Sequence, residues 1–139
     1  MKRLFVLVCA LGLWAAAWAA PEVNIVPKPL NVETGDGSFT VDAATVVTVG
    51  RDASLRSVGE LFAAMIEPVT GRAVKVKTAA DGAKIDLAVD PELGEEEYVL
   101  RVTPAGADVR GGSPKGVLYG LQSLRQLVIE GEGLSLIHI

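Results

Sequence analysis

The sequence predicts an α+β fold, a two-layer sandwich in which two amphipathic helices pack on one face of a mostly antiparallel β-sheet. Several short segments alternate apolar and polar residues or are rich in β-branched residues, and Gly, Pro or Asp residues separate them. Two longer segments instead repeat apolar residues every three or four positions, as helices with one buried face do. Strands with one polar face are typical of antiparallel sheets, so we expect mostly antiparallel pairing.

The first 19 residues have the features of a secretory signal peptide. Lys2 and Arg3 precede an apolar run over residues 4–14, and the segment 17–19 (Ala-Trp-Ala) has the small-x-small form that signal peptidase cleaves. We expect cleavage after Ala19 or, alternatively, after Ala20. The mature protein would then be secreted or periplasmic.

Two other interpretations of this leader fit its residues less well. A transmembrane anchor needs roughly 20 apolar residues, and Pro21 makes a poor end to such a helix. Lipid attachment at Cys9 requires a small residue before the cysteine, whereas Val8 stands there. We therefore predict no stable membrane insertion.

The composition of the remaining chain excludes several classes of protein. The 139 residues include 13 Lys and Arg, 17 Asp and Glu, and a single Cys, with a net charge of −4. Because Lys2, Arg3 and Cys9 lie in the leader, its removal leaves 11 basic residues, 17 acidic residues, no Cys and a net charge of −6. An acidic surface without basic clusters argues against nucleic acid. We expect no cofactor and no disulfide.

The predicted strands fall into two groups around the first helix. Those before it are residues 23–26, 30–33, 39–41 and 45–49, and those after it are residues 73–78, 84–89, 97–102 and 107–110. Pro27 lacks a backbone N–H, so the first strand can only begin or edge a sheet. The pair Asp81-Gly82 predicts a hairpin between two of the later strands.

The first helix is predicted over residues 55–69, where the apolar residues mark one face. Asp52 is a suitable N-cap, because its carboxylate accepts a hydrogen bond from an early backbone N–H. Pro68 should weaken the helix, since its ring clashes with the carbonyl four residues earlier. Gly71 can adopt the left-handed conformation that closes the last turn.

The second helix is predicted to begin at Ser113 and Pro114, with Ser as N-cap and Pro at the first helical position. Its apolar stripe covers residues 117–128, and Gly131 should end it. The preceding Gly111-Gly112 resembles the start of a phosphate-binding loop, but the segment lacks the Gly-Lys-Ser/Thr ending that such a loop requires. We interpret these residues as a turn and a helix cap.

No residue pattern predicts an active site in this chain. Glu92 and residues 95–97 form an acidic run on a loop or strand entry. Consecutive side chains there point in different directions and do not form a matched acid/base pair, so we interpret the run as a solvated surface. His138 has no Cys or acidic cluster near it that would form a zinc site or a triad. The mature chain has few aromatic residues for a sugar-binding platform: Phe39, Phe62, Tyr98 and Tyr119. We therefore assign no catalytic, cofactor-binding or metal-binding residue.

Three segments nevertheless resemble the N-terminal domain of glycoside hydrolase family 20, the β-N-acetylhexosaminidases. They are Ile25–Pro29, Leu93–Leu100 and Gly116–Leu127. The third is the most specific, with the pattern Gly-x-x-Tyr-Gly-x-Gln-Ser-Leu-x-Gln-Leu. The resemblance implies that residues 20–133 form this α+β domain and that residues 134–139, where the family's entry into the next domain is missing, are a truncated or artefactual tail.

The third segment has two physical interpretations. Gly116, Gly120 and Ser123 lie near one another on a helix, so they would let a neighbouring backbone approach closely. Gln122 and Gln126 share a face and could bond to a partner surface, which favours docking to a larger domain. Alternatively, the helix packs only on its own sheet.

The resemblance also implies what the parent protein does. Family members place this domain before a (β/α)₈ barrel, which removes terminal β-linked N-acetylglucosamine or N-acetylgalactosamine by substrate-assisted retention. No position of this chain matches the barrel's catalytic residues, so the chain would be a non-catalytic part whose partner is that barrel. Alternatives are the leading domain of a family 84 hexosaminidase or an α-glucuronidase, or a stand-alone glycan- or protein-binding module.

Overall fold

The computed structural model describes residues 24–33, 38–82, 84–128 and 134–135. The predicted signal peptide with both candidate cleavage sites lies outside these residues, as do Gly131 and residues 136–139. The helix predicted to run to Gly131 ends at Gln126, five residues earlier. The predictions about the leader therefore stay predictions.

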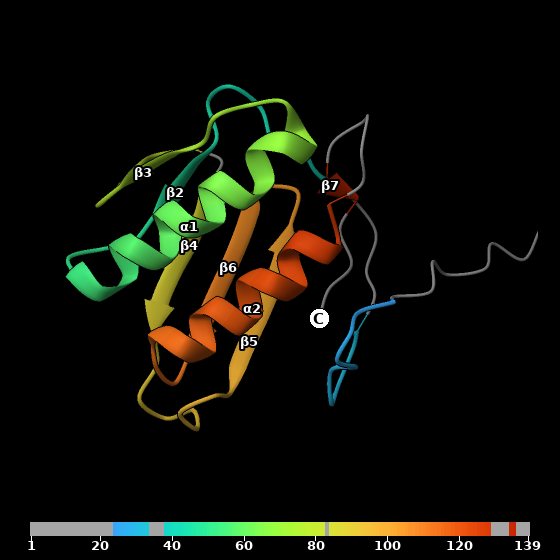
Figure 1. Cartoon of the computed structure of the whole chain (residues 1–139), viewed down its shortest axis with the longest axis vertical. Coiled ribbons are helices and arrows are strands. Elements are labelled where there is room, and N and C mark those ends of the chain that lie inside the picture. The colour runs from blue at the N-terminus through green and yellow to red at the C-terminus, as the bar shows by residue number, and fades with distance from the viewer. Residues whose placement is uncertain (1–23, 34–37, 83, 129–133, 136–139) are drawn as a thin grey trace, which may run out of the picture.

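Two helices cover one face of a five-stranded sheet, as the sequence predicts (Figure 1). The helices are α1 (Ala53–Thr70) and α2 (Pro114–Gln126). The sheet has the order β3-β2-β4-β6-β5, and its strands are β2 (Val46–Thr48), β3 (Lys75–Lys77), β4 (Lys84–Val89), β5 (Tyr98–Thr103) and β6 (Gly106–Gly111). A separate two-stranded sheet pairs β1 (Ser38–Phe39) with β7 (Leu134–Ser135) in antiparallel orientation.

The expectation of mostly antiparallel pairing is wrong in detail. The pairs β2–β3, β2–β4 and β4–β6 are parallel, and β5–β6 is antiparallel. The helix α1 connects β2 to β3, and such a crossover returns the chain to the same end of the sheet and produces a parallel pair. One polar face appears in parallel strands too when helices cover only one side, so alternation does not encode strand direction.

The predicted hairpin at Asp81-Gly82 is also wrong. Strands β3 and β4 do not pair with each other, because both flank β2 and run parallel to it. The chain still turns at Gly82, whose φ of 85° lies in the region that glycine adopts readily. A turn at Pro104 and Ala105 joins the antiparallel pair β5–β6.

The caps of α1 lie where the sequence places them. Asp52 accepts a hydrogen bond from the backbone N–H of Ser54 at 2.9 Å, and Gly71, at φ 65°, donates to the carbonyl of Glu67 at 2.8 Å. The helix continues through Pro68 to Thr70. Because only two helical residues follow Pro68, its missing N–H removes a hydrogen bond from the last turn alone.

The core lies between the helices and the sheet. Alternate residues of β4, β5 and β6 point towards α1 and α2, and the apolar stripes of both helices are buried against them. The largest fully buried side chains are Phe39, Phe62, Leu55, Ile66, Ile85, Leu100, Leu121 and Leu124. Hydrophobic burial on this single interface stabilises the two layers as one unit.

The N-terminal segment 24–33 differs from its prediction. The described part of the predicted strands 23–26 and 30–33 is not assigned to a strand. Pro27 and Pro29 have no N–H to give to a sheet ladder, which explains the irregular backbone. Ile25 is nevertheless buried in the core cluster, at 4% exposure, so the segment is anchored by its side chain.

Candidate functional site

The start of α2 is closed onto the loop before β5. The Ser113 hydroxyl donates to the carbonyl oxygen of Glu95 at 2.6 Å and accepts from two N–H groups of the first helical turn. The N–H of Gly112 donates to the carbonyl of Glu97 at 3.0 Å. A Cβ atom on Gly112 would lie 2.0 Å from the carbonyl oxygen of Gly94, so no side chain fits there. This confirms the turn-and-cap interpretation, since the glycine allows two backbones to meet.

The acidic run stabilises the same loop. The Glu97 carboxylate accepts from the N–H of Gly94 at 2.9 Å, and Glu96 pairs with Lys115 of α2. The hydrogen bond that Lys115 donates to Glu96, together with the negative charge of Glu96, raises the pKa of Lys115 above its ordinary value. Residues 95–97 are exposed. The interpretation of this run as a solvated surface is therefore confirmed.

The middle of α2 packs on its own sheet. The hydroxyls of Ser123 and Tyr98 are 2.7 Å apart and hydrogen-bonded. A Cβ atom on Gly120 would lie 2.6 Å from Cγ1 of Val109 and 3.1 Å from the ring of Tyr98. Gly116, Gly120 and Ser123 are all buried within the domain. Of the two interpretations of these small residues, packing on the domain's own sheet is the one that the structure confirms.

The end of α2 holds the N-terminal segment. The side-chain amide of Gln126 accepts from the backbone N–H of Val26 at 2.9 Å and donates to the carbonyl of the same residue at 3.0 Å. Both Gln122 and Gln126 are exposed, but Gln126 is hydrogen-bonded to another segment of the domain. The sequence analysis missed this contact. In the sequence, the only indication of this contact is Gln126 itself, the second Gln of the helical pattern. Its partner, Val26, lies 100 residues away.

The three segments that carry the family resemblance therefore meet along one helix. The Ser113 cap and Gly116 contact the loop 94–97, Ser123 contacts Tyr98, and Gln126 contacts Val26. These contacts fix how α2 sits on the sheet edge and on the N-terminal segment. The polar side-chain groups of Ser113, Ser123 and Gln126 are thus used in hydrogen bonds within the domain.

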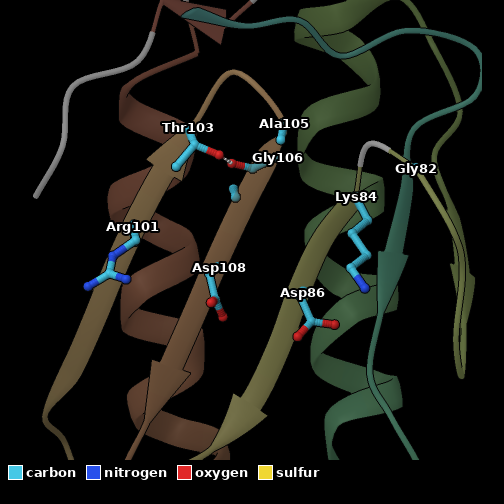
Figure 2. Close-up of a pocket in the computed structure, with 9 residues that line it drawn as sticks. Gly82, Lys84, Asp86, Arg101, Thr103, Ala105, Gly106 and Asp108 are labelled. Carbon is cyan, nitrogen blue, oxygen red and sulfur yellow. Dashed lines mark hydrogen bonds between the residues drawn. The ribbon is translucent and has the colours of Figure 1, made fainter. Parts of the chain in front are cut away.

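A second candidate is a hollow of about 450 Å³ on the sheet face away from the helices (Figure 2). Thr48, Asp86, Asp108 and Arg101 form one row across four strands, because they are register partners in successive strand pairs. Lys84 lies beside this row on β4. The hollow thus combines two carboxylates with two cationic side chains.

The two carboxylates of this hollow have separate partners. Like charges directly opposite each other destabilise a sheet unless they are compensated. Asp86 accepts a hydrogen bond from the Thr48 hydroxyl, and an oxygen of Asp108 is 3.4 Å from Nε of Arg110. This arrangement is a charge-balanced polar face rather than an acid–base pair. Asp86 is half-buried.

The four aromatic side chains in the described part of the chain do not form a sugar-binding platform. Phe39 and Phe62 are fully buried, and Tyr98 packs on Gly120. Tyr119 is half-buried, with the ammonium of Lys115 5.9 Å from its ring centre. A platform needs an exposed ring face, so these four residues do not support the alternative of a stand-alone glycan-binding module.

The described residues contain neither a candidate metal-binding cluster nor a helix that could span a membrane. No group of three or more His, Cys, Asp or Glu side chains in that part of the chain is placed to hold a metal ion. Neither α1 nor α2 has the length and apolar character needed to span a membrane. The prediction that the chain has no catalytic, cofactor-binding or metal-binding residue stays a prediction.

The fold and the contacts of α2 with Glu95, Tyr98 and Val26 define a class of protein. It is a small α+β domain in which the segments that resemble the family contact one another. The chain belongs to glycoside hydrolase family 20, because residues 22–139 match the family model "Glycosyl hydrolase family 20, domain 2". It is 34% identical over 113 residues to a β-N-acetylhexosaminidase of Cellulomonas fimi, covering 78% of this chain and 23% of that protein. It is also 31% identical over 144 aligned positions to a β-hexosaminidase of Porphyromonas gingivalis, covering 92% of this chain and 18% of that protein.

A solved structure agrees with this assignment. The N-acetyl-β-hexosaminidase of Streptomyces plicatus, in complex with Thio-NAglucal, superposes with a TM-score of 0.69 and 28% sequence identity. The match covers 82% of this chain and 24% of that one. The chain thus spans less than a quarter of the length of each relative named here, and it corresponds to the domain outside the catalytic barrel.

Proposed function

We propose that this chain is the non-catalytic α+β domain of a longer, secreted, exo-acting β-N-acetylhexosaminidase. A (β/α)₈ barrel following it in the parent protein hydrolyses terminal β-linked N-acetylglucosamine or N-acetylgalactosamine by substrate-assisted retention. In that mechanism the acetamido oxygen of the substrate attacks the anomeric carbon, and a barrel carboxylic acid acts as general acid and base.

The convergence of the three family segments on α2 supports this proposal most directly. If the resemblance came from a binding or catalytic site, its polar atoms would point towards an open cavity. Within these segments, Ser123 instead bonds to Tyr98 and Gln126 to Val26, and the carbonyl of Glu95 accepts from the Ser113 hydroxyl that caps α2. These polar groups are used within the domain, which supports a structural role rather than a catalytic one.

The activity is tested on the parent protein with two chromogenic substrates. We expect hydrolysis of an aryl β-N-acetylglucosaminide and almost none of the matching β-glucoside, which lacks the acetamido nucleophile. Equal rates on the two substrates, or no release from any β-N-acetylhexosaminide, would contradict the proposal. The 139-residue chain assayed alone should show no turnover, and measurable turnover would contradict its non-catalytic role.

Secretion is tested separately. The leader of residues 1–19, with its basic start and its Ala-Trp-Ala end, supports export. Fractionation of the producing cell followed by N-terminal sequencing should find a mature protein that begins at Ala20, or at Pro21 if cleavage follows Ala20. A cytoplasmic protein that retains Met1 would refute the prediction.

A further inference from the structure

The face of the sheet that points away from the helices gathers cationic side chains from four strands, and we call it the cationic face. Its cations are Lys75 and Lys77 on β3, Lys84 on β4, Arg101 on β5 and Arg110 on β6. They point away from the helices because they alternate along each strand with residues that pack against α1 or α2. Each strand contributes only one or two of the 13 basic residues, so the expectation of a surface without basic clusters is wrong for this face.

Most of these cations are not neutralised by a carboxylate. Within the described part of the chain, only Arg110 forms an ion pair, with Asp108. The hollow described above is charge-balanced, but the whole cationic face has five cations and only two strand carboxylates, Asp86 and Asp108. The chain as a whole has a net charge of −4, so this face has the opposite sign. A surface of one sign raises the local concentration of ligands of the other sign.

Protection of the sheet edge explains only part of this pattern. β3 is an end strand, and Lys side chains on an end strand discourage pairing with another sheet. This accounts for Lys75 and Lys77. Lys84 and Arg110 instead lie on the inner strands β4 and β6, which already have a neighbour on each side. The spread of positive charge over inner and outer strands therefore requires another explanation.

The order of charges on the cationic face matches the chemistry of an acidic polysaccharide. One row of register partners runs from Lys77 through Thr48, Asp86 and Asp108 to Arg101, and Figure 2 shows its last three residues. The row crosses four strand intervals of about 4.8 Å each, with a cation at each end and carboxylates between. In a polysaccharide that carries acidic groups on some of its sugars, the cations bind those groups. The carboxylates accept hydrogen bonds from the hydroxyls of the uncharged sugars.

Other polyanions fit this face less well. A nucleic acid carries a charge on every unit, so Asp86 and Asp108 would repel its phosphates. Single-stranded nucleic acid is also bound through aromatic side chains on which bases stack, and the strand residues of this face include none. Elements that bind a lipid surface bury apolar side chains in it. Val99, at 44% exposure, is the only large exposed hydrophobic residue of the five strands.

We propose that the cationic face binds an acidic polysaccharide. The hollow of about 450 Å³ between Lys84 and Arg101 has a volume typical of small-ligand sites, about 300–1,000 Å³, and provides a recess for a sugar unit between the cations. The proposal rests on the proposed function, because a glycosidase parent brings the domain into contact with glycans. The face holds the polymer by charge and hydrogen bonds and takes no part in the hydrolysis.

The test measures binding of the parent protein to hyaluronan oligosaccharides by titration calorimetry at low ionic strength. The oligosaccharides end in a uronic acid, so an exo-acting hexosaminidase does not shorten them, and the same oligosaccharides with their carboxylates reduced to alcohols are the uncharged control. The face variant combines Lys77→Gln with Arg101→Gln. The matched control variant combines Arg56→Gln with Arg125→Gln, which removes the same charge from exposed positions on the two helices.

We expect the parent to bind the acidic oligosaccharides, with an affinity that falls as salt is added, and not the reduced ones. The face variant should raise Kd about fivefold or more, because two exposed ion pairs are lost. The control variant and the charge-preserving Arg101→Lys should each stay within about twofold of the parent.

Four outcomes would overturn the proposal. Equal weakening by the face and control variants would show that total charge, and not this face, determines binding. Equal binding of the reduced oligosaccharides would exclude a role for their acidic groups. Tighter, face-dependent binding of single-stranded DNA of equal charge would assign the face to nucleic acid. No binding, with a lower urea midpoint of the parent for the face variant alone, would assign it to an acidic surface within the parent, and no binding without that change would leave the face without a ligand of this class. These readouts do not use hydrolysis, so a parent without activity would contradict the proposed function and leave the binding test interpretable.

Discussion

Gly116→Ala tests the claim that the helical family pattern is a packing pattern. Gly116 lies in α2, where intrinsic helix propensity favours Ala by about 0.8–1.0 kcal/mol. Its Cβ atom, however, would lie 2.6 Å from the carbonyl oxygen of Glu97 and 3.2 Å from that of Glu95. Both are backbone atoms, so they cannot rotate away as a flexible side chain would. Propensity and packing therefore predict opposite signs.

Packing should determine the outcome. Overpacking of a buried site costs about 1–3 kcal/mol, and a shift of α2 would also weaken the bond from Ser113 to Glu95, worth about 1 kcal/mol. After the propensity gain, we expect a net loss of about 1–3 kcal/mol in the free energy of unfolding. Each kcal/mol lowers Tm by about 4–8 °C in a domain of roughly 60–100 residues, and by slightly less in a larger one such as this.

The assay is urea and thermal unfolding of the chain followed by circular dichroism. Ser57→Ala, at an exposed position of α1, is the control for propensity alone and should stabilise by no more than about 0.5 kcal/mol. If Gly116→Ala stabilised the chain to a similar or greater extent, the close approach of α2 to the loop 94–97 would be refuted. The packing interpretation of the family pattern would then be wrong.

Two further changes test the ends of the helices. Gln126→Ala should lower the free energy of unfolding by about 1–2 kcal/mol through loss of its bonds to Val26, whereas Gln122→Ala should have little effect; equal losses would show that the contact contributes nothing specific. Hydrogen bonds from the Ser54 hydroxyl and N–H hold the pKa of Asp52 below its ordinary value. Its stabilisation is thus present above the unfolded-state pKa and is lost as pH falls through the lower folded-state pKa. Asp52→Asn should flatten that part of a plot of urea midpoint against pH, and an unchanged slope would argue against it.

Local features of this fold could be predicted from sequence because they depend on neighbouring residues. The caps at Asp52 and Ser113 need only a side-chain oxygen and the next turn of backbone, and both occur as predicted. The helix-facing strand residues follow from alternation. Strand direction does not, because both orientations give the same alternation when one face of the sheet is polar. The crossover role of α1, with β3 and β4 on either side of β2, follows from tertiary packing.

The contacts of α2 with the rest of the domain were harder to predict, because they depend on tertiary packing. The partner of Ser113 at Glu95 is 18 residues away, and the partner of Gln126 at Val26 is 100 residues away. No local rule connects such pairs. The sequence showed that Val26, Glu95 and Gln126 belong to segments that resemble the family, but it left open whether the small residues of α2 faced a partner or their own sheet. Only the arrangement of the strands distinguishes these possibilities.

This arrangement changes what the family resemblance means in this part of the chain. A residue retained for chemistry must reach substrate, whereas Gly112, Gly116 and Gly120 are needed because other atoms occupy the space of a side chain. Ser113 and Gln126 are needed because they satisfy backbone groups that would otherwise lack partners. Such constraints preserve the shape of the domain, and the exposed Val26 and Leu30 are the residues that this shape does not explain.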